Sequence, residues 1–155
     1  MNEPREPAGD RLPLRQRAIR LLARREHTRA ELAAKLAALG TREDIEIVLA
    51  DLENSGLLSD ARAAAAYVRG HAARFGAARL RQTLRTKGVA TELIDAEVAA
   101  LPDEIGRARD LWSRKFGSAP ADAREWAKQA RFLQSRGFST DVIRRLLKHT
   151  GEATE

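Results

Sequence analysis

An internal repeat is the sequence feature that most restricts the fold of this chain. Three glycines, Gly40, Gly88 and Gly137, stand 48 and 49 residues apart. Each has a leucine four residues before it and an aliphatic residue five residues after it. These flanking residues are Leu36, Leu84 and Leu133, and Ile45, Leu93 and Val142. Self-similarity at a fixed period of this length is typical of stacked units that each touch mainly their neighbours. The sequence therefore predicts three copies of one unit.

Apolar residues inside each unit recur at the spacing of an amphipathic helix. In the first unit Leu32, Leu36 and Leu39 form such a stripe, which we expect to be buried. Thr28 and Glu31 precede it at the spacing of a capping box, in which the hydroxyl and the carboxylate satisfy free amides at a helix start. No stretch of useful length alternates apolar and polar residues as a half-buried strand would. We therefore predict an all-α chain.

Glycine and proline mark where the helices end. Gly40 stands where a left-handed helix end costs little. Phe75 and Gly76 interrupt the second repeat, and Pro102 stops the last helix of that repeat. The predicted fold is a set of tandem three-helix-bundle repeats, three units with about nine helices, elongated and curved. We divide the chain into a disordered arm at residues 1–12, repeats at 13–58, 59–102 and 103–149, and a tail at 150–155.

The core of such a chain must be aliphatic, because aromatic residues make up only 5% of it. Leu, Ile, Val and Ala then supply most of the buried surface. Tyr67, Trp112 and Trp126 fall in phase with aliphatic residues. We therefore expect them to be core anchors, although stacking platforms for nucleic-acid bases are the alternative.

Several classes of function lack their sequence signals. The chain has no cysteine, no stretch of 18 apolar residues and no apolar segment typical of a secretory signal. Its three histidines are scattered, and glycine-rich phosphate loops are missing. His27 precedes a helix start and is expected to pack or lie at the surface. These observations predict a cytoplasmic protein that is not an enzyme and that needs no metal or cofactor.

Charge is distributed unevenly along the chain. The net charge is +6, and such a chain attracts polyanions. Residues 26–60 hold eight acidic residues, whereas residues 61–91 hold none. Arg81 and Arg85 stand one helical turn apart with no acid beside them in sequence, which is unfavourable unless a partner supplies negative charge. The candidate binding residues are Arg62, Arg69, Arg74, Arg79, Arg81, Arg85 and Lys87.

The same central stretch, residues 56–89, resembles the RecX family. Ala64 replaces an aromatic residue of the family pattern, and Phe75 with Gly76 stands where Lys-Gly is expected. The residues that match the pattern are Gly56, Leu57, Leu58, Asp60, Arg62, Tyr67, Val68, Arg69, Gly76, Arg79, Leu80, Leu84, Lys87, Gly88 and Val89.

Residues 21–36 and 130–147 are similar to the N-terminal and C-terminal signals of that family, so the resemblance covers about residues 14–148. It implies a protein of three three-helix units, curved to fit the groove of the RecA–DNA filament, and we expect this protein to be a monomer. Such a protein would bind that filament and damp its recombinase, ATPase and co-protease activities in DNA repair, homologous recombination and the SOS response. Single-stranded or double-stranded DNA is a further possible partner, and no membrane is implied.

Two other functions remain open at this stage. One is a free-standing DNA-binding regulator of the helix-turn-helix class, whose outline a three-helix unit shares. Against it, Gln82 is the only amide side chain well placed on the basic helices to read a base. The other is a helical scaffold for an acidic protein, without nucleic acid.

Overall fold

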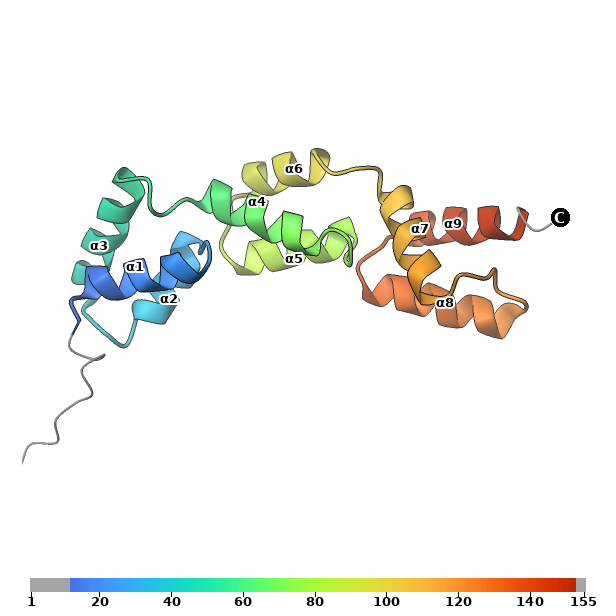
Figure 1. Cartoon of the computed structure of the whole chain (residues 1–155), viewed down its shortest axis with the longest axis horizontal. Helices are drawn as coiled ribbons and strands as arrows, with labels where there is room; N and C mark the ends of the chain where they lie inside the picture. The colour runs from blue at the N-terminus through green and yellow to red at the C-terminus, as the bar shows by residue number, and fades with distance from the viewer. Residues whose placement is uncertain (1–11, 153–155) are drawn as a thin grey trace, which may run out of the picture. The chain divides into compact units, whose positions relative to one another are not determined.

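The computed structural model describes residues 12–152, which form nine α-helices and no strand (Figure 1). The prediction of an all-α chain with three helices in each repeat is confirmed, whereas its curvature stays a prediction. Apart from Leu12, the predicted arm lies outside the described residues, as do residues 153–155 of the predicted tail. The chain divides into two compact units, Met1–Ala63 and Ala64–Glu155, called unit 1 and unit 2 below.

Unit 1 holds the first repeat, with helices α1 (Leu14–Arg24), α2 (Arg29–Leu36) and α3 (Arg42–Asn54). The predicted capping box is present at the start of α2. The amide of Glu31 donates to Thr28 Oγ1 at 3.1 Å, and the amide of Thr28 donates to Glu31 Oε1 at 3.3 Å. The buried core consists of Ala18, Leu32, Leu36, Ile45, Leu49, Leu52 and Leu58.

The end of α2 differs from the expectation. Leu39 is 45% exposed, because α2 ends at Leu36 and the residues after it form a turn. Gly40 does not have the left-handed backbone that was predicted, since it is not among the positive-φ glycines. A Cβ atom at this glycine would instead lie 3.2 Å from the Leu14 side chain. The turn thus favours glycine for space and not for backbone conformation.

Unit 2 holds the second and third repeats, and each has its own core. The second repeat is formed by α4 (Asp60–His71, whose first residues belong to unit 1), α5 (Ala77–Thr86) and α6 (Thr91–Ala99). The third repeat is formed by α7 (Glu104–Lys115), α8 (Ala123–Ser135) and α9 (Thr140–Glu152). One core is Ala64, Val68, Leu84, Val89 and Ile94, and the other is Ala108, Trp112, Leu133, Phe138, Val142, Ile143, Leu146 and Leu147.

The second and third repeats share one helix-ending turn. Gly88 has φ +81° and Gly137 has φ +90°, a region that residues with a Cβ rarely adopt. In each turn the residue after the glycine donates its amide to the carbonyl of the preceding leucine, Leu84 or Leu133, at 3.0 and 3.2 Å. This six-residue closure accounts for the recurring leucine-to-glycine spacing in these two repeats.

The aromatic residues divide between core and surface. Trp112 is buried, and its indole N–H donates to Gln129 Oε1 at 2.7 Å. Tyr67 packs against the core of the second repeat. The prediction for Trp126 is wrong, because this side chain is 38% exposed and is not part of the third core. Trp126 lies on the same face of α8 as the buried Leu133. The position on a helix face does not determine whether another helix covers that turn.

Candidate binding surface

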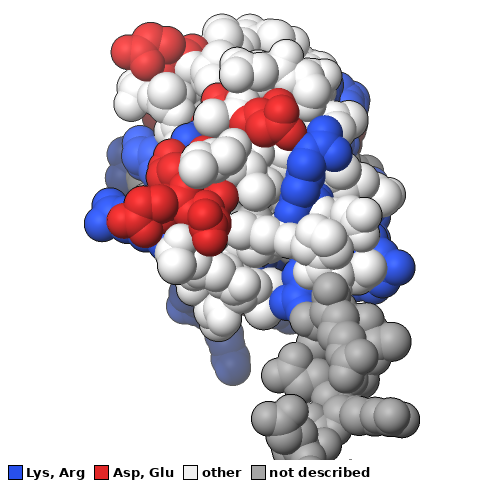
Figure 2. Space-filling model, turned by 90° about the vertical axis from the view of Figure 1, so that its left-hand side faces the viewer, with Lys and Arg blue, Asp and Glu red and all other residues white. Residues whose placement is uncertain are grey.

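Most charge in unit 1 is internally balanced. Arg29 bridges two acids of α3: its Nη2 lies 2.7 Å from Glu46 Oε2, and its Nε donates to Glu53. Hydrogen bonds from Arg29 lower the pKa of Glu46, and the bonds to both carboxylates raise the pKa of Arg29. Figure 2 shows acidic residues gathered on the face of the molecule that looks toward the viewer, with basic residues around them. Further ion pairs join Arg15 to Asp51 at 2.6 Å and Arg25 to Glu31 at 2.9 Å.

His27 is buried in unit 1, as a packing role requires. The residue is 1% exposed. Nε2 lies 3.0 Å from Lys35 Nζ and must accept from that ammonium, so Nδ1 carries the proton and donates to the Arg25 carbonyl at 3.0 Å. Burial is the main cause that lowers the pKa of His27. The histidine is therefore a neutral part of the packing before α2.

Two of the seven candidate residues are neutralised by acids of the same chain. Arg62 Nε lies 3.0 Å from Glu26 Oε1 within unit 1. Arg81 Nη1 donates to Asp95 of α6, so the expectation that Arg81 has no acidic neighbour is wrong. The acid was missed because it stands 14 residues further along the chain and reaches Arg81 only when α5 packs on α6.

Three other candidates lie against aromatic rings. The guanidinium carbons of Arg79 and Arg74 lie 3.9 and 5.5 Å from the centre of the Phe75 ring. Arg79 Nη1 also donates to the Ser135 carbonyl at 3.2 Å. Lys87 Nζ lies 5.5 Å from the centre of the Tyr67 ring. Such contacts orient a cation and leave its charge in place.

Arg69 and Arg85 are the most available of the seven. Both are exposed, Arg69 in the last turn of α4 and Arg85 in the last turn of α5. Within residues 12–152, neither side chain has a hydrogen bond or an ion pair. These two guanidinium groups retain all their donors for a partner.

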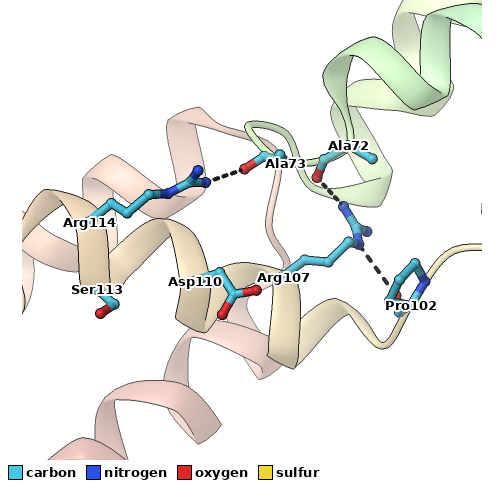
Figure 3. Close-up of a pocket in the computed structure, with 7 residues that line it drawn as sticks. All are labelled: Ala72, Ala73, Pro102, Arg107, Asp110, Ser113 and Arg114. Atoms are coloured by element: carbon cyan, nitrogen blue, oxygen red, sulfur yellow. Dashed lines mark hydrogen bonds between the residues drawn. The ribbon is translucent and has the colours of Figure 1, made fainter.

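An arginine outside the predicted set forms hydrogen bonds between the second and third repeats. Arg107 of α7 is 8% exposed. Its Nη1 donates to the carbonyls of Ala72 and Phe75, each at 2.8 Å, and its Nε donates to the Pro102 carbonyl at 3.3 Å. Figure 3 shows Arg107 and Arg114 both reaching from α7 toward the residues that follow α4. Arg114 Nη2 donates to the Ala73 carbonyl at 3.0 Å.

The acceptors of Arg107 explain its burial. The Ala72 carbonyl follows the end of α4 at His71, and the Phe75 carbonyl directly precedes the N-cap of α5, so neither oxygen belongs to a helix and both can accept from Arg107. Burial lowers the pKa of Arg107, opposed by the nearby carboxylates of Glu104 and Asp103. An arginine nevertheless stays charged in a protein.

The same turn meets repeat 3 through its backbone. The Gly76 amide donates to the Arg136 carbonyl at 2.7 Å, and the Ala77 amide donates to Glu104 Oε1 at 3.3 Å. A Cβ atom at Gly76 would lie 2.3 Å from the Gly137 oxygen, and one at Gly137 would lie 2.4 Å from Arg79 Cβ. We call this contact between residues 72–79 and repeat 3 the joint.

The joint adds cations that the candidate set did not include. Arg136 and Lys115 lie over the Phe132 ring, 5.1 and 5.5 Å from its centre.

The sequence did carry a signal for Arg107, because it stands four residues before Leu111 and next to Ala108 on the apolar stripe of α7. A charge inside an apolar stripe indicates a buried partner.

The described residues contain neither a membrane-spanning helix nor a metal site. No helix between residues 12 and 152 is long and apolar enough to cross a membrane. No three His, Asp or Glu side chains of that part of the chain gather as a metal site requires.

Comparison with family models gives three matches in succession. The first, second and third three-helix domains of RecX match residues 15–52, 59–97 and 103–147. These matches cover all three repeats.

Individual proteins are similar over nearly the whole chain. The regulatory protein RecX of Leptothrix cholodnii is 54% identical over 139 residues, which are 88% of this chain and 88% of that protein. The regulatory protein RecX of Herminiimonas arsenicoxydans is 42% identical over 137 residues, covering 87% of this chain and 91% of its own. The crystal structure of RecX from Lactobacillus salivarius has a TM-score of 0.75 at 20% identity and covers 94% of this chain and 99% of its own, which supports the fold.

Proposed function

Because the chain belongs to the RecX family, we propose that it is a non-enzymatic regulator that binds the RecA–DNA filament. It mostly inhibits the recombinase, ATPase and co-protease activities of that filament in DNA repair and the SOS response. It acts in the cytoplasm as a monomer, without a cofactor.

The observation that carries this proposal is the pair of free guanidinium groups in a segment without acids. Arg69 and Arg85 are exposed and unneutralised, and residues 61–91 contain no Asp or Glu. A guanidinium group binds phosphate or carboxylate through two parallel hydrogen bonds, so these side chains suit both the DNA and the acidic surface of a protein filament. Positive charge that no acid of the chain neutralises also speeds association with a polyanion.

The other five candidates take different weights in this proposal. Arg74 and Arg79 keep their charge beside the Phe75 ring and support the binding surface, and Lys87 lies beside the Tyr67 ring. Arg62 and Arg81 already hold carboxylates, so they contribute less to a partner.

The test is a titration of the protein into RecA on single-stranded DNA with ATP. Hydrolysis of ATP and strand exchange should both fall as the protein approaches stoichiometric amounts. The double variant Arg69→Glu, Arg85→Glu should lose most of this inhibition. The matched control is Arg42→Glu, Arg124→Glu, which changes the net charge equally at two exposed arginines outside residues 61–91. Equal loss in both double variants would mean that total charge, and not this surface, is responsible.

The same proteins separate the proposal from free-standing DNA binding. Under the alternative, the chain binds a specific duplex without RecA, and its affinity falls steeply with salt in proportion to the phosphate contacts. Under the proposal, inhibition requires the assembled filament. Unchanged ATPase and strand exchange at stoichiometric protein would count against the proposal.

A further inference from the structure

The joint contains one charged side chain that the proposed binding surface does not use. Arg107 is 8% exposed and donates to three carbonyls, and no carboxylate of residues 12–152 forms an ion pair with it. A buried cation is expensive unless hydrogen bonds replace its hydration. Two of its acceptors, Ala72 and Phe75, belong to the turn after α4, whereas Arg107 itself belongs to the third repeat. The side chain is therefore solvated by the neighbouring repeat.

We propose that Arg107 is a positioning residue, which fixes the third repeat against the second so that the cations of both repeats meet a polyanionic partner as one rigid surface. This inference rests on the proposed binding of the RecA–DNA filament. Arg107 touches no partner itself and acts through the orientation of cations on each side of the joint, such as the exposed Arg85 and the half-buried Arg136.

A rigid connection between the second and third repeats should strengthen binding. Cations on two loosely joined repeats would have to be ordered when they meet a regular filament, and that ordering weakens affinity. At the joint Arg79 bonds to the Ser135 carbonyl, and Arg114 bonds to the Ala73 carbonyl. These bonds lie beside the Arg107 bonds and depend on the same alignment.

An arginine suits this position better than a lysine. One Nη atom carries two hydrogens and reaches both Ala72 and Phe75 at 2.8 Å, while Nε serves Pro102. The planar group is preorganised for several acceptors and is less strongly hydrated than an ammonium. Arg107→Lys should therefore keep the charge and still loosen the joint.

The first measurement concerns the joint alone. The natural chain has no cysteine, so Gln82→Cys in α5 and Lys148→Cys in α9 can carry two spin labels at exposed positions. The label–label distance distribution should be narrow with Arg107 present and clearly broader in Arg107→Met. The control Arg109→Met removes the same charge from an exposed position of the same helix and should leave the distribution narrow.

The second measurement concerns binding to RecA filaments on single-stranded DNA. Affinity should fall by about tenfold or more in Arg107→Met, as expected when flexible parts must be ordered on binding, and should change little in Arg109→Met. A covalent link should then restore it. Ala73 and Ser113 line, together with Arg107, the pocket drawn in Figure 3, so cysteines placed there can be joined by a bis-maleimide linker in the Arg107→Met background. The same link with Arg107 intact should leave affinity unchanged.

Each outcome decides the matter. Broadening of the distances together with rescue by the linker supports the positioning role. A narrow distribution in Arg107→Met, or lost affinity that the linker does not restore, overturns it. If Arg107→Met does not fold by circular dichroism, Arg107→Lys is measured in the same way, and failure of both to fold also overturns the inference. If the unaltered chain does not bind the filament, the proposed function fails while the distance measurement still shows whether Arg107 holds the joint.

Discussion

Arg29 in unit 1 and Arg107 in unit 2 both bind several oxygens, but the oxygens differ. Arg29 donates to the carboxylates of Glu46 and Glu53, and it remains partly exposed. Arg107 donates to three backbone carbonyls and is buried. One side chain is neutralised by its partners, and the other is solvated by neutral dipoles.

The difference shows that the kind of partner decides whether an arginine that is held in place keeps its charge. In the first repeat, Arg15, Arg25 and Arg29 are held by acids that also cancel them, whereas Arg20 and Arg24 are exposed and form no ion pair among the described residues. In the second and third repeats, Arg79, Arg107 and Arg136 lie against carbonyls or an aromatic ring, which leave the charge in place, although Arg81 is neutralised by Asp95. Arginine thus builds structure in both units and keeps its attraction for anions where its partners are neutral.

The largest loss of stability should come from separating the second and third repeats in unit 2 without changing any arginine. Gly76→Ala places a Cβ atom 2.3 Å from the Gly137 oxygen, so the backbones must move apart. We expect a loss of about 3 kcal/mol in the free energy of unfolding. Gly106→Ala is the control, because its Cβ meets nothing within 4 Å and alanine favours a helix by about 0.5–1 kcal/mol. Urea unfolding measures both, and equal stability of the two variants would refute the close contact.

The next largest effect should come from removing each arginine in turn. Arg107→Met leaves the Ala72 and Phe75 carbonyls without their donor, at a cost of roughly 1–3 kcal/mol. Arg29→Met breaks surface ion pairs, which are worth about 1 kcal/mol or less. Thermal and urea unfolding of the two variants give the comparison directly. A larger loss for Arg29→Met would reverse the assignment of the two roles.

Acid should then distinguish the two arginines by their partners. Arg29 lowers the pKa of Glu46, so this pair stabilises the fold above the ordinary carboxyl pKa of 4.5 and the stabilisation is lost as pH falls through the lowered value. The stability difference between the natural chain and Glu46→Gln should therefore shrink from pH 6 toward pH 3. The difference caused by Arg107→Met should change less over that range, because the acceptors of Arg107 are carbonyls, which do not titrate, and the nearby Glu104 and Asp103 form no ion pair with it among the described residues. Urea midpoints at each pH provide the measurement.

The smallest expected effect concerns His27 in unit 1. Burial lowers its pKa below 6.5, so the unfolded chain binds the proton more readily than the folded chain. The contribution of the neutral His27 to the free energy of unfolding is complete above pH 6.5 and is lost as pH falls below 6.5. Stability should drop between pH 7 and pH 5.5, and His27→Gln should flatten this part of the profile. An unchanged slope in that variant would show that another group causes the dependence.

Local sequence signals predicted the helices well. The Thr28 and Glu31 spacing predicted a capping box that is present, and the leucine-to-glycine spacing reflects the shared turn at Gly88 and Gly137. These features involve residues within six positions of one another. They depend on backbone geometry, which a short segment determines by itself.

Features that depend on packing between helices were mostly missed. The partner of Arg81 is Asp95 on the next helix, and the exposure of Trp126 depends on whether another helix covers its turn. Arg107 was overlooked because its charge suggested a surface position, although its place in an apolar stripe indicated burial. A candidate surface read from sequence therefore includes cations that the fold has already neutralised.

The Gly76 amide gives the joint a natural reporter. This hydrogen is bonded to the Arg136 carbonyl at 2.7 Å, outside any helix of its own repeat. It can exchange with deuterium in the solvent only when that bond opens. Its nuclear magnetic resonance signal therefore records how often the second and third repeats separate. The measurement concerns a single site and needs no spin label and no substitution.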